Sequence, residues 1–155
     1  MTQKAISQGF SALETILPGV SKQKHLWQAW QRLWNILVRQ LEDASIGMAI
    51  LSLDGHFLKA NPVLCQIIGY SPEELLGLTF ESITHPDDLE ADIKNVNQLV
   101  TGKMSSYSQR EKRYIHKQGH IVWSLLNASV ITDKEGNPLN LIAHIQDITA
   151  RKEAQ

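Results

Sequence analysis

The chain has 155 residues, of which 43% are hydrophobic and 20% charged, so its composition and length fit one globular domain with a real core. A formal net charge of −1 argues against a dedicated nucleic-acid-binding protein, and the single cysteine excludes an intrachain disulfide framework. No stretch approaches the roughly 18 consecutive apolar residues of a membrane-spanning helix, and the N-terminus lacks the apolar core of a signal peptide. We therefore expect a cytoplasmic protein with no membrane span and no nucleic-acid partner.

Residues 1–44 are predicted to be helical. A first apolar stripe ends at Pro18-Gly19, and a second helix is expected over residues 22–45. The apolar positions of this second helix alternate by three and four: Trp27, Trp30, Trp34, Leu37, Leu41 and Ala44. Exposed tryptophans on one stripe would make an adhesive surface, so we expect the stripe to be covered. The opposite face mixes Arg with Gln, Asn and Glu side chains and is not basic enough to favour a membrane anchor.

From Ser45 onward the pattern becomes extended. Asp54-Gly55 separates two short apolar runs, which is the strongest short-range signal for a β-hairpin. Three helices are expected to begin at residues 62, 72 and 86, each at a proline, where the missing N–H leaves no hydrogen bond unmade. Strands are expected over residues 105–116, 120–132 and 138–148. This order predicts an α+β fold with an antiparallel sheet and helices on one face.

Two strings in this part of the chain carry a family resemblance. DGHFLKANPVLCQIIGYSPEELLGLTFESITHPDDL resembles the first half of a PAS domain, and YIHKQGHIVWSLLNASVITDKEGNPLNLIAHIQDITARKEA resembles the second half, including the closing Asp-Ile-Thr. The resemblance implies a PAS fold: a five-stranded antiparallel sheet in the order 2-1-5-4-3, with short helices on one face. We expect an N-terminal helical extension (1–44), a PAS domain (45–149) and the start of a C-terminal linker (150–155).

The resemblance also implies an interior pocket. The candidate lining residues are Tyr114, Ser124, Leu126, Ala128 and Ile145. They are mostly apolar, so any ligand is expected to be apolar or aromatic, and a filled core without a ligand is the favoured alternative. A flavin photoadduct is disfavoured because Phe80 stands where light-sensing PAS domains carry a reactive cysteine. Haem is disfavoured because the helix expected after Pro86 contains no histidine. We expect no cofactor, no metal site and no catalytic residue.

The same resemblance assigns one parity of the last strands to the outer face of the sheet, which then carries Trp and Leu side chains and needs a cover. We expect the tryptophan helix to cover it, from the same chain or from a second copy, and to form part of a homodimer contact. The residues expected in this packing are Trp27, Trp30, Trp34, Leu37, Leu41, Trp123 and Leu125.

The function expected from these features is that of a PAS sensory or signalling module within a larger bacterial-type signalling protein, and not that of an enzyme. Asp147, Ile148 and Thr149 are expected to relay changes from the last strand into a C-terminal effector, such as a histidine kinase or a diguanylate cyclase. The alternatives are a haem- or flavin-bearing redox or light sensor, and a pure dimerisation or assembly module with no ligand.

Overall fold

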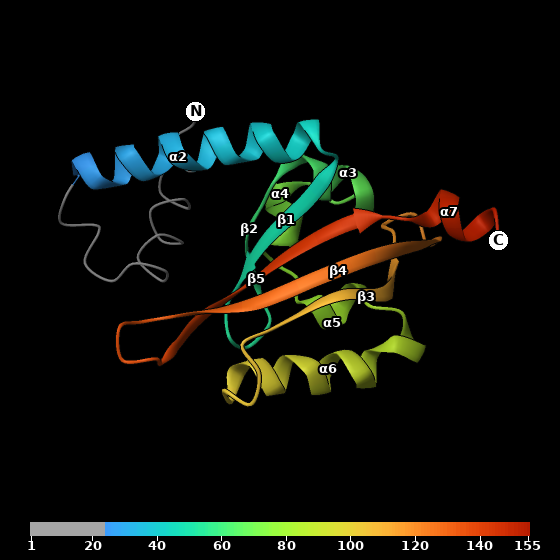
Figure 1. Ribbon diagram of the computed structural model, residues 1–155. Coiled ribbons are helices and arrows are strands. Elements are labelled where there is room, and N and C mark those ends of the chain that lie inside the picture. The colour runs from blue at the N-terminus through green and yellow to red at the C-terminus, as the bar shows by residue number, and fades with distance from the viewer. Residues whose placement is uncertain (1–23) are drawn as a thin grey trace.

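The structure is a computed structural model that describes residues 24–155, apart from the side chains of residues 24–27 and of Trp30 (Figure 1). The predicted first helix and the packing of Trp27 and Trp30 lie outside the described residues. The helices are α2 (Lys24–Asp43), α3 (Pro62–Ile68), α4 (Pro72–Leu75), α5 (Phe80–Ile83), α6 (Pro86–Val100) and α7 (Thr149–Glu153). The strands are β1 (Ile46–Leu51), β2 (Phe57–Ala60), β3 (Ser106–Ile115), β4 (Ile121–Thr132) and β5 (Pro138–Asp147).

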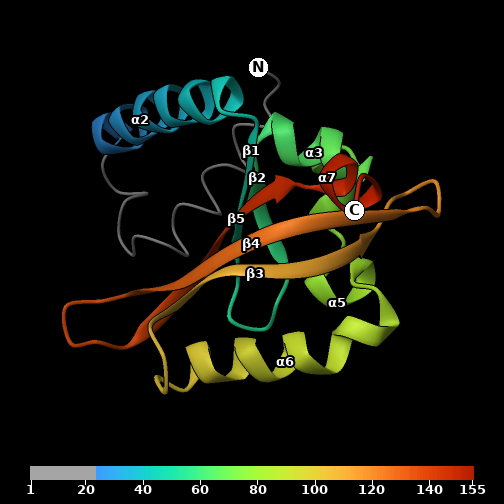
Figure 2. The ribbon, with the colours of Figure 1, turned by 45° about the vertical axis from the view of Figure 1, so that its right-hand side comes forward.

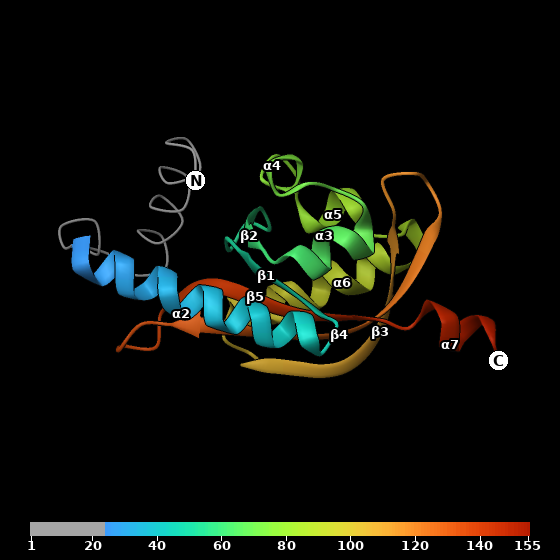
Figure 3. The same ribbon diagram turned by 90° about the horizontal axis from the view of Figure 1, so that it is seen from above.

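The five strands form one sheet in the order β2-β1-β5-β4-β3, and every neighbouring pair is antiparallel. This confirms the predicted α+β class and strand order. Helices α3 to α6 gather on one side of the sheet (Figure 3). Strand β3 is an edge strand, and α6 runs next to it (Figure 2). None of the helices within residues 24–155 is both long and apolar enough to cross a bilayer.

Asn61 joins the first helix of the domain to the first strand. Its side chain is fully buried, and its Oδ1 accepts hydrogen bonds from the backbone N–H groups of Leu64 (3.0 Å) and Met48 (2.9 Å). Its Nδ2 donates to the carbonyl of Ile46 at 2.9 Å. The first bond is the helix cap that the sequence predicts, and the other two fasten the start of α3 to β1.

The main core lies between the sheet and helices α3 to α6. Alternate residues of β4 and β5 point into it, so that Leu126, Leu141, Ala143 and Ile145 are buried there. Strand β1 is buried on both faces, as its unbroken apolar run predicts, because it lies in the interior of the sheet.

Helix α2 covers part of the outer face of the sheet. Trp34, which is 8% exposed, forms a second buried cluster with Met48 and Ile50 of β1. Partly buried side chains surround this cluster: Val38, Leu41, Leu58 and Ile142. The described part of the stripe, from Trp34 to Leu41, therefore packs over β1, β2 and β5 within one chain.

Two residues expected in the packing of this stripe lie outside this cluster. Leu37 is expected in the sheet packing or in a dimer contact, and it is 48% exposed in the single chain. The packed side of the helix runs through Trp34, Val38 and Leu41, and Leu37 lies at its margin. Trp123 of β4 also lies outside this cluster, because α2 does not extend over β4.

Candidate functional site

A small interior cavity lies between the sheet and helices α5 and α6. Its volume is about 40 Å³, which is room for roughly three water molecules. Four of the predicted lining residues border it: Tyr114, Leu126, Ala128 and Ile145. The prediction is wrong for Ser124, which is fully buried beside the cavity and whose hydroxyl donates a hydrogen bond to the carbonyl of Lys112 at 2.9 Å. The Ser124 hydroxyl thus gives a backbone carbonyl of the edge strand β3 a hydrogen-bond partner, and Ser124 does not border the cavity.

One wall of the cavity contains a buried ion pair between Asp92 of α6 and Lys112 of β3. The side chains of Lys112 and Asp92 are 5% and 4% exposed, and the Lys112 Nζ lies 2.5 Å from Oδ2 of Asp92. The ammonium also lies 4.4 Å from the ring centre of Tyr114 and 5.5 Å from that of Phe80. Of the described residues that line the cavity, only Asp92 and Lys112 carry a charged side chain.

The sequence analysis missed this pair because Lys112 stands in a charge-rich strand that suggests a solvated edge. Two signals point to it. Lys112 shares the parity of the buried Tyr114, and Asp92 lies one helical turn after Asp88 on the side of α6 that faces β3.

Burial alters the pKa values around the cavity. Desolvation lowers the pKa of the Lys112 ammonium, and the carboxylate of Asp92 opposes that shift. Desolvation, with a contribution from the charge of Asp92, raises the pKa of both Tyr107 and Tyr114. Both phenols are therefore uncharged at neutral pH, and the wall is neutral when the ion pair is intact.

Outside this wall, between α6 and β3, lies a polar groove of about 290 Å³. Asp92 and Lys112 line both the groove and the interior cavity, so the ion pair separates the two spaces. Asn95, which is 8% exposed, also lines the groove, and its Nδ2 finds no hydrogen-bond partner among the described residues.

The N-terminal end of α6 is clamped to the same strand. Asp88 accepts hydrogen bonds from the backbone N–H of Arg113 (2.8 Å), from its Nε (3.0 Å) and from its Nη2 (2.7 Å). The side-chain hydrogen bonds from Arg113 lower the pKa of the Asp88 carboxyl group. The backbone N–H of His85 adds a bond to the carbonyl of Arg113 at 3.0 Å.

The described residues around the cavity do not fit haem or flavin. No histidine among them borders the cavity, and His85 instead caps α6, where its Nδ1 accepts a hydrogen bond from the N–H of Asp87 at 3.1 Å. Desolvation raises the pKa of the Cys65 thiol, which keeps it protonated and poorly nucleophilic. Among the side chains that the structure describes, no three His, Cys, Asp or Glu residues gather as a metal site.

The three predicted relay residues meet at the junction between β5 and α7. Thr149 donates its backbone N–H to Oδ1 of Asp147 at 2.9 Å, and its hydroxyl oxygen accepts from the backbone N–H of Trp123 at 3.0 Å. The N–H of Ile148 donates to the carbonyl of Trp123 at 2.9 Å, and the Ile148 side chain is 5% exposed. The junction is thus fastened to the neighbouring strand β4.

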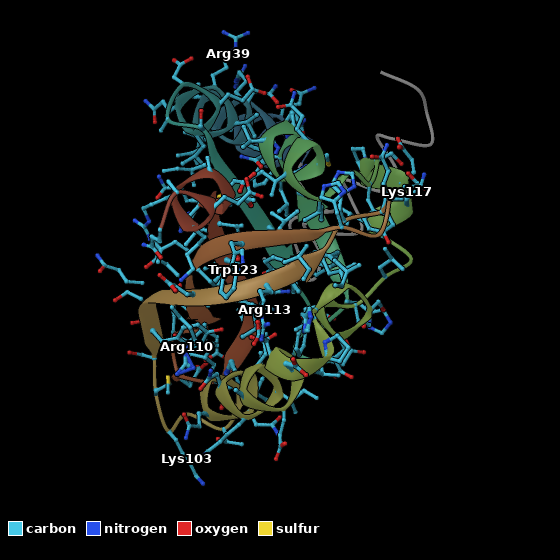
Figure 4. The ribbon with its side chains drawn as sticks, turned by 90° about the vertical axis from the view of Figure 1, so that its right-hand side faces the viewer. Arg39, Lys103, Arg110, Arg113, Lys117 and Trp123 are labelled. Atoms are coloured by element: carbon cyan, nitrogen blue, oxygen red, sulfur yellow. The ribbon has the colours of Figure 1, made fainter. Side chains whose placement is uncertain are left out.

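Helix α7 folds back onto the outer face of β3 and β4. Glu111 accepts a hydrogen bond from Nζ of Lys152 at 2.8 Å and lies 3.6 Å from a guanidinium nitrogen of Arg151. The guanidinium of Arg113 lies 5.2 Å from the ring centre of Trp123, and Figure 4 shows these two side chains on neighbouring strands. The sequence analysis did not predict these contacts.

Comparisons with known proteins agree with this architecture. The family model described as the PAS fold matches residues 57–145. Probable diguanylate cyclase DgcE of Escherichia coli (strain K12) is 39% identical over 135 residues, which cover 87% of this chain and 12% of that protein. Sensor histidine kinase TmoS of Ectopseudomonas mendocina is 27% identical over 114 residues, which cover 74% of this chain and also 12% of that protein.

A solved structure supports the fold independently. The PAS domain of a protein from Colwellia psychrerythraea superposes with a TM-score of 0.63 at 24% identity, covering 74% of this chain and 99% of that domain. The strand order, the helices on one face and the match over residues 57–145 lead to one conclusion: this chain belongs to the PAS-fold family.

Proposed function

We propose that this chain is the sensory and signalling module of a larger bacterial-type signalling protein. It relays changes in the interior cavity or at a dimer contact through β5 and α7 to an effector on its C-terminal side, and it works in the cytoplasm without a nucleic-acid partner. The names of its relatives support an effector of the diguanylate cyclase or histidine kinase type, although the matched segment covers only 12% of each relative.

The observation that carries this proposal is the junction around Thr149. A strand that ends in solvent would let the following helix move independently of the domain. Here Oδ1 of Asp147 accepts a hydrogen bond from the backbone N–H of Thr149, the first residue of α7, and the hydroxyl of Thr149 accepts one from the backbone N–H of Trp123. A displacement of β4 or β5 therefore has to move the start of α7.

A dimer contact through α2 is the second part of the proposal. Leu33, Ile36 and Leu37 are 61%, 54% and 48% exposed on the part of α2 that does not pack on the sheet. Three large aliphatic side chains on one helix form an apolar patch of the kind that marks a protein–protein contact.

The relay is tested in a chimera that joins a diguanylate cyclase domain in frame after Gln155, with cyclic di-GMP formation as the readout. The Asp147→Ala variant is expected to change the rate about fivefold or more, the lower end of ordinary coupling between sites. The matched control is Asp133→Ala, which removes a similar carboxylate cap from the distant turn between β4 and β5. An unchanged rate for Asp147→Ala, with the domain still folded, contradicts the relay.

The small cavity favours a second candidate function, an assembly module that dimerises through α2 and takes no ligand. In that case the chimera depends on the dimer alone. Its output then follows substitutions on α2 and not substitutions in the cavity wall.

A further inference from the structure

The ion pair of Asp92 and Lys112 determines what the cavity can accept. The rest of the lining is apolar or aromatic, so these two side chains and the phenols of Tyr107 and Tyr114 are its polar groups. The pair lies between the cavity and the outer groove, and both of its side chains line both spaces.

A charged ligand is unfavourable at this wall. The two opposite charges compensate each other in a site from which water is largely excluded. A carboxylate on the ligand would place a second negative charge beside Asp92, and an amine would place a second positive charge beside Lys112. Either leaves one buried charge uncompensated, which is strongly destabilising.

A ligand without any polar group is also poorly matched. A lysine ammonium has three N–H donors, of which Asp92 takes one, and a carboxylate has more acceptor positions than one ammonium fills. A hydroxyl or carboxamide group can accept from Lys112 and donate to Asp92, and it adds no charge.

We infer that the Asp92–Lys112 pair makes this cavity selective for small molecules with an apolar body and one uncharged hydroxyl or carboxamide group, and that it excludes carboxylates and amines. The inference rests on the proposed function, in which the cavity is the sensory input, and it names the chemical class of that input. The head group lies at the pair, and the apolar body lies against the aliphatic residues of β4 and β5.

The pair also lies on a strand that contacts the output helix α7, so that ligand binding at the pair can affect this helix. Three consecutive residues of β3 make three connections: Glu111 holds α7, Lys112 forms the cavity wall and Arg113 holds α6. A ligand that draws the Lys112 side chain toward its head group thus acts on the strand that carries the Glu111 contact.

The selectivity is measured with four probes that share one two-carbon body, which suits a cavity of about 40 Å³: ethanol, acetamide, acetate and ethylamine. Each is titrated into the ¹⁵N-labelled full chain, and backbone amide shifts at Lys112 and Tyr114 report binding. Ethanol and acetamide are expected to bind about tenfold more tightly than the two charged probes, the effect of about one hydrogen bond to a charged group. Equal or tighter binding of acetate or ethylamine overturns the inference, and so does the failure of all four probes to bind.

Single substitutions in the pair should invert the selectivity. Asp92→Asn leaves the charge of Lys112 and should make acetate the preferred probe. Lys112→Met leaves the charge of Asp92 and should make ethylamine the preferred probe. The control, Asp133→Asn, removes an exposed carboxylate from the turn between β4 and β5 and should keep the original order. A pair variant that also keeps the original order overturns the inference.

A double substitution covers the case in which the single variants do not fold. Asp92→Leu with Lys112→Met makes the wall apolar, and such replacements of buried ion pairs are often tolerated. This variant should bind ethanol about tenfold more weakly than the natural chain, and undiminished binding contradicts the role of the pair. The chimera separates the two ideas, because Asp147→Ala changes its output whether or not the cavity selects uncharged head groups.

Discussion

The ammonium of Lys152 in α7 lies 4.6 Å from the ring centre of Trp123 in β4. Side chains of α7 and of Arg113 therefore cover Trp123, and α2 does not. The outer face of the sheet is thus shared by two helices from opposite ends of the described chain. Helix α7, at the C-terminal end of the domain, packs on β4, which lies next to the edge strand β3.

Arg151 and Lys152 of α7 both lie within ion-pair distance of the carboxylate of Glu111 in β3. We expect Glu111→Gln to speed amide hydrogen exchange in residues 149–153 and to leave the melting temperature of the domain nearly unchanged, because Glu111 is exposed and packs in no core. The control, Glu135→Gln, alters an exposed glutamate in a distant turn and should leave that exchange as it is. Unaltered exchange in α7 of the Glu111 variant would show that the helix is held by other contacts.

Breaking the buried ion pair on one side should be costly. We expect Lys112→Met to lower the free energy of unfolding by about 3–5 kcal/mol, because it leaves the carboxylate of Asp92 buried without a counter-charge. The double variant with Asp92→Leu should recover most of that loss. Urea denaturation measures both values, and a Lys112→Met domain as stable as the natural one would contradict the buried placement of the pair.

Asn61 should be more important for stability than an ordinary helix cap. We expect Asn61→Ala to cost about 2–4 kcal/mol, because it removes one cap and leaves the N–H of Met48 and the carbonyl of Ile46 without their partner. The control, Ser71→Ala, removes an exposed cap of α4 and should cost about 1 kcal/mol. Equal losses in urea denaturation would mean that the bonds to β1 contribute nothing.

The Asp88–Arg113 pair should give the domain an acid-dependent component of stability. The folded-state pKa of Asp88 is lowered, so its contribution is fully present above the unfolded value of about 3.9 and is lost as pH falls through the lower folded value. We expect the difference in urea midpoint between the natural chain and Asp88→Asn to be constant near neutral pH and to shrink below about pH 4. A difference that stays constant into strong acid would contradict the contribution of this carboxylate.

The proposed dimer is tested on the exposed side of α2. We expect the natural chain to sediment as a dimer at micromolar concentration and the Leu33→Glu/Leu37→Glu variant to sediment as a monomer, because two charges would have to be buried in the contact. The control, Gln40→Glu, places a charge on an already polar and exposed position of the same helix. A natural chain that stays monomeric, or a double variant that stays dimeric, would reject this interface.

The sequence by itself determined the elements and their order. Proline at the first helical position, the Asn61 and Ser71 caps and the Asp54-Gly55 turn act within a few residues, so their physics can be read locally. Alternate residues of a strand point to opposite faces, and the resemblance assigned which parity of β4 and β5 faces the core. The resemblance then supplied the sheet order that the structure confirms.

Only the tertiary structure decided which side chains meet. Asp92 and Lys112 stand 20 residues apart on elements that each look solvated, and their pairing depends on how α6 is placed against β3. The resemblance places Trp123 on the outer face of the sheet, where the helix of Trp34 is expected to cover it. In the structure Trp34 packs on β1, and Lys152 of α7 contacts Trp123. Where a helix lies depends on how whole apolar faces pack against one another. The sequence pattern predicts that a face is apolar, but it does not predict which element packs on it.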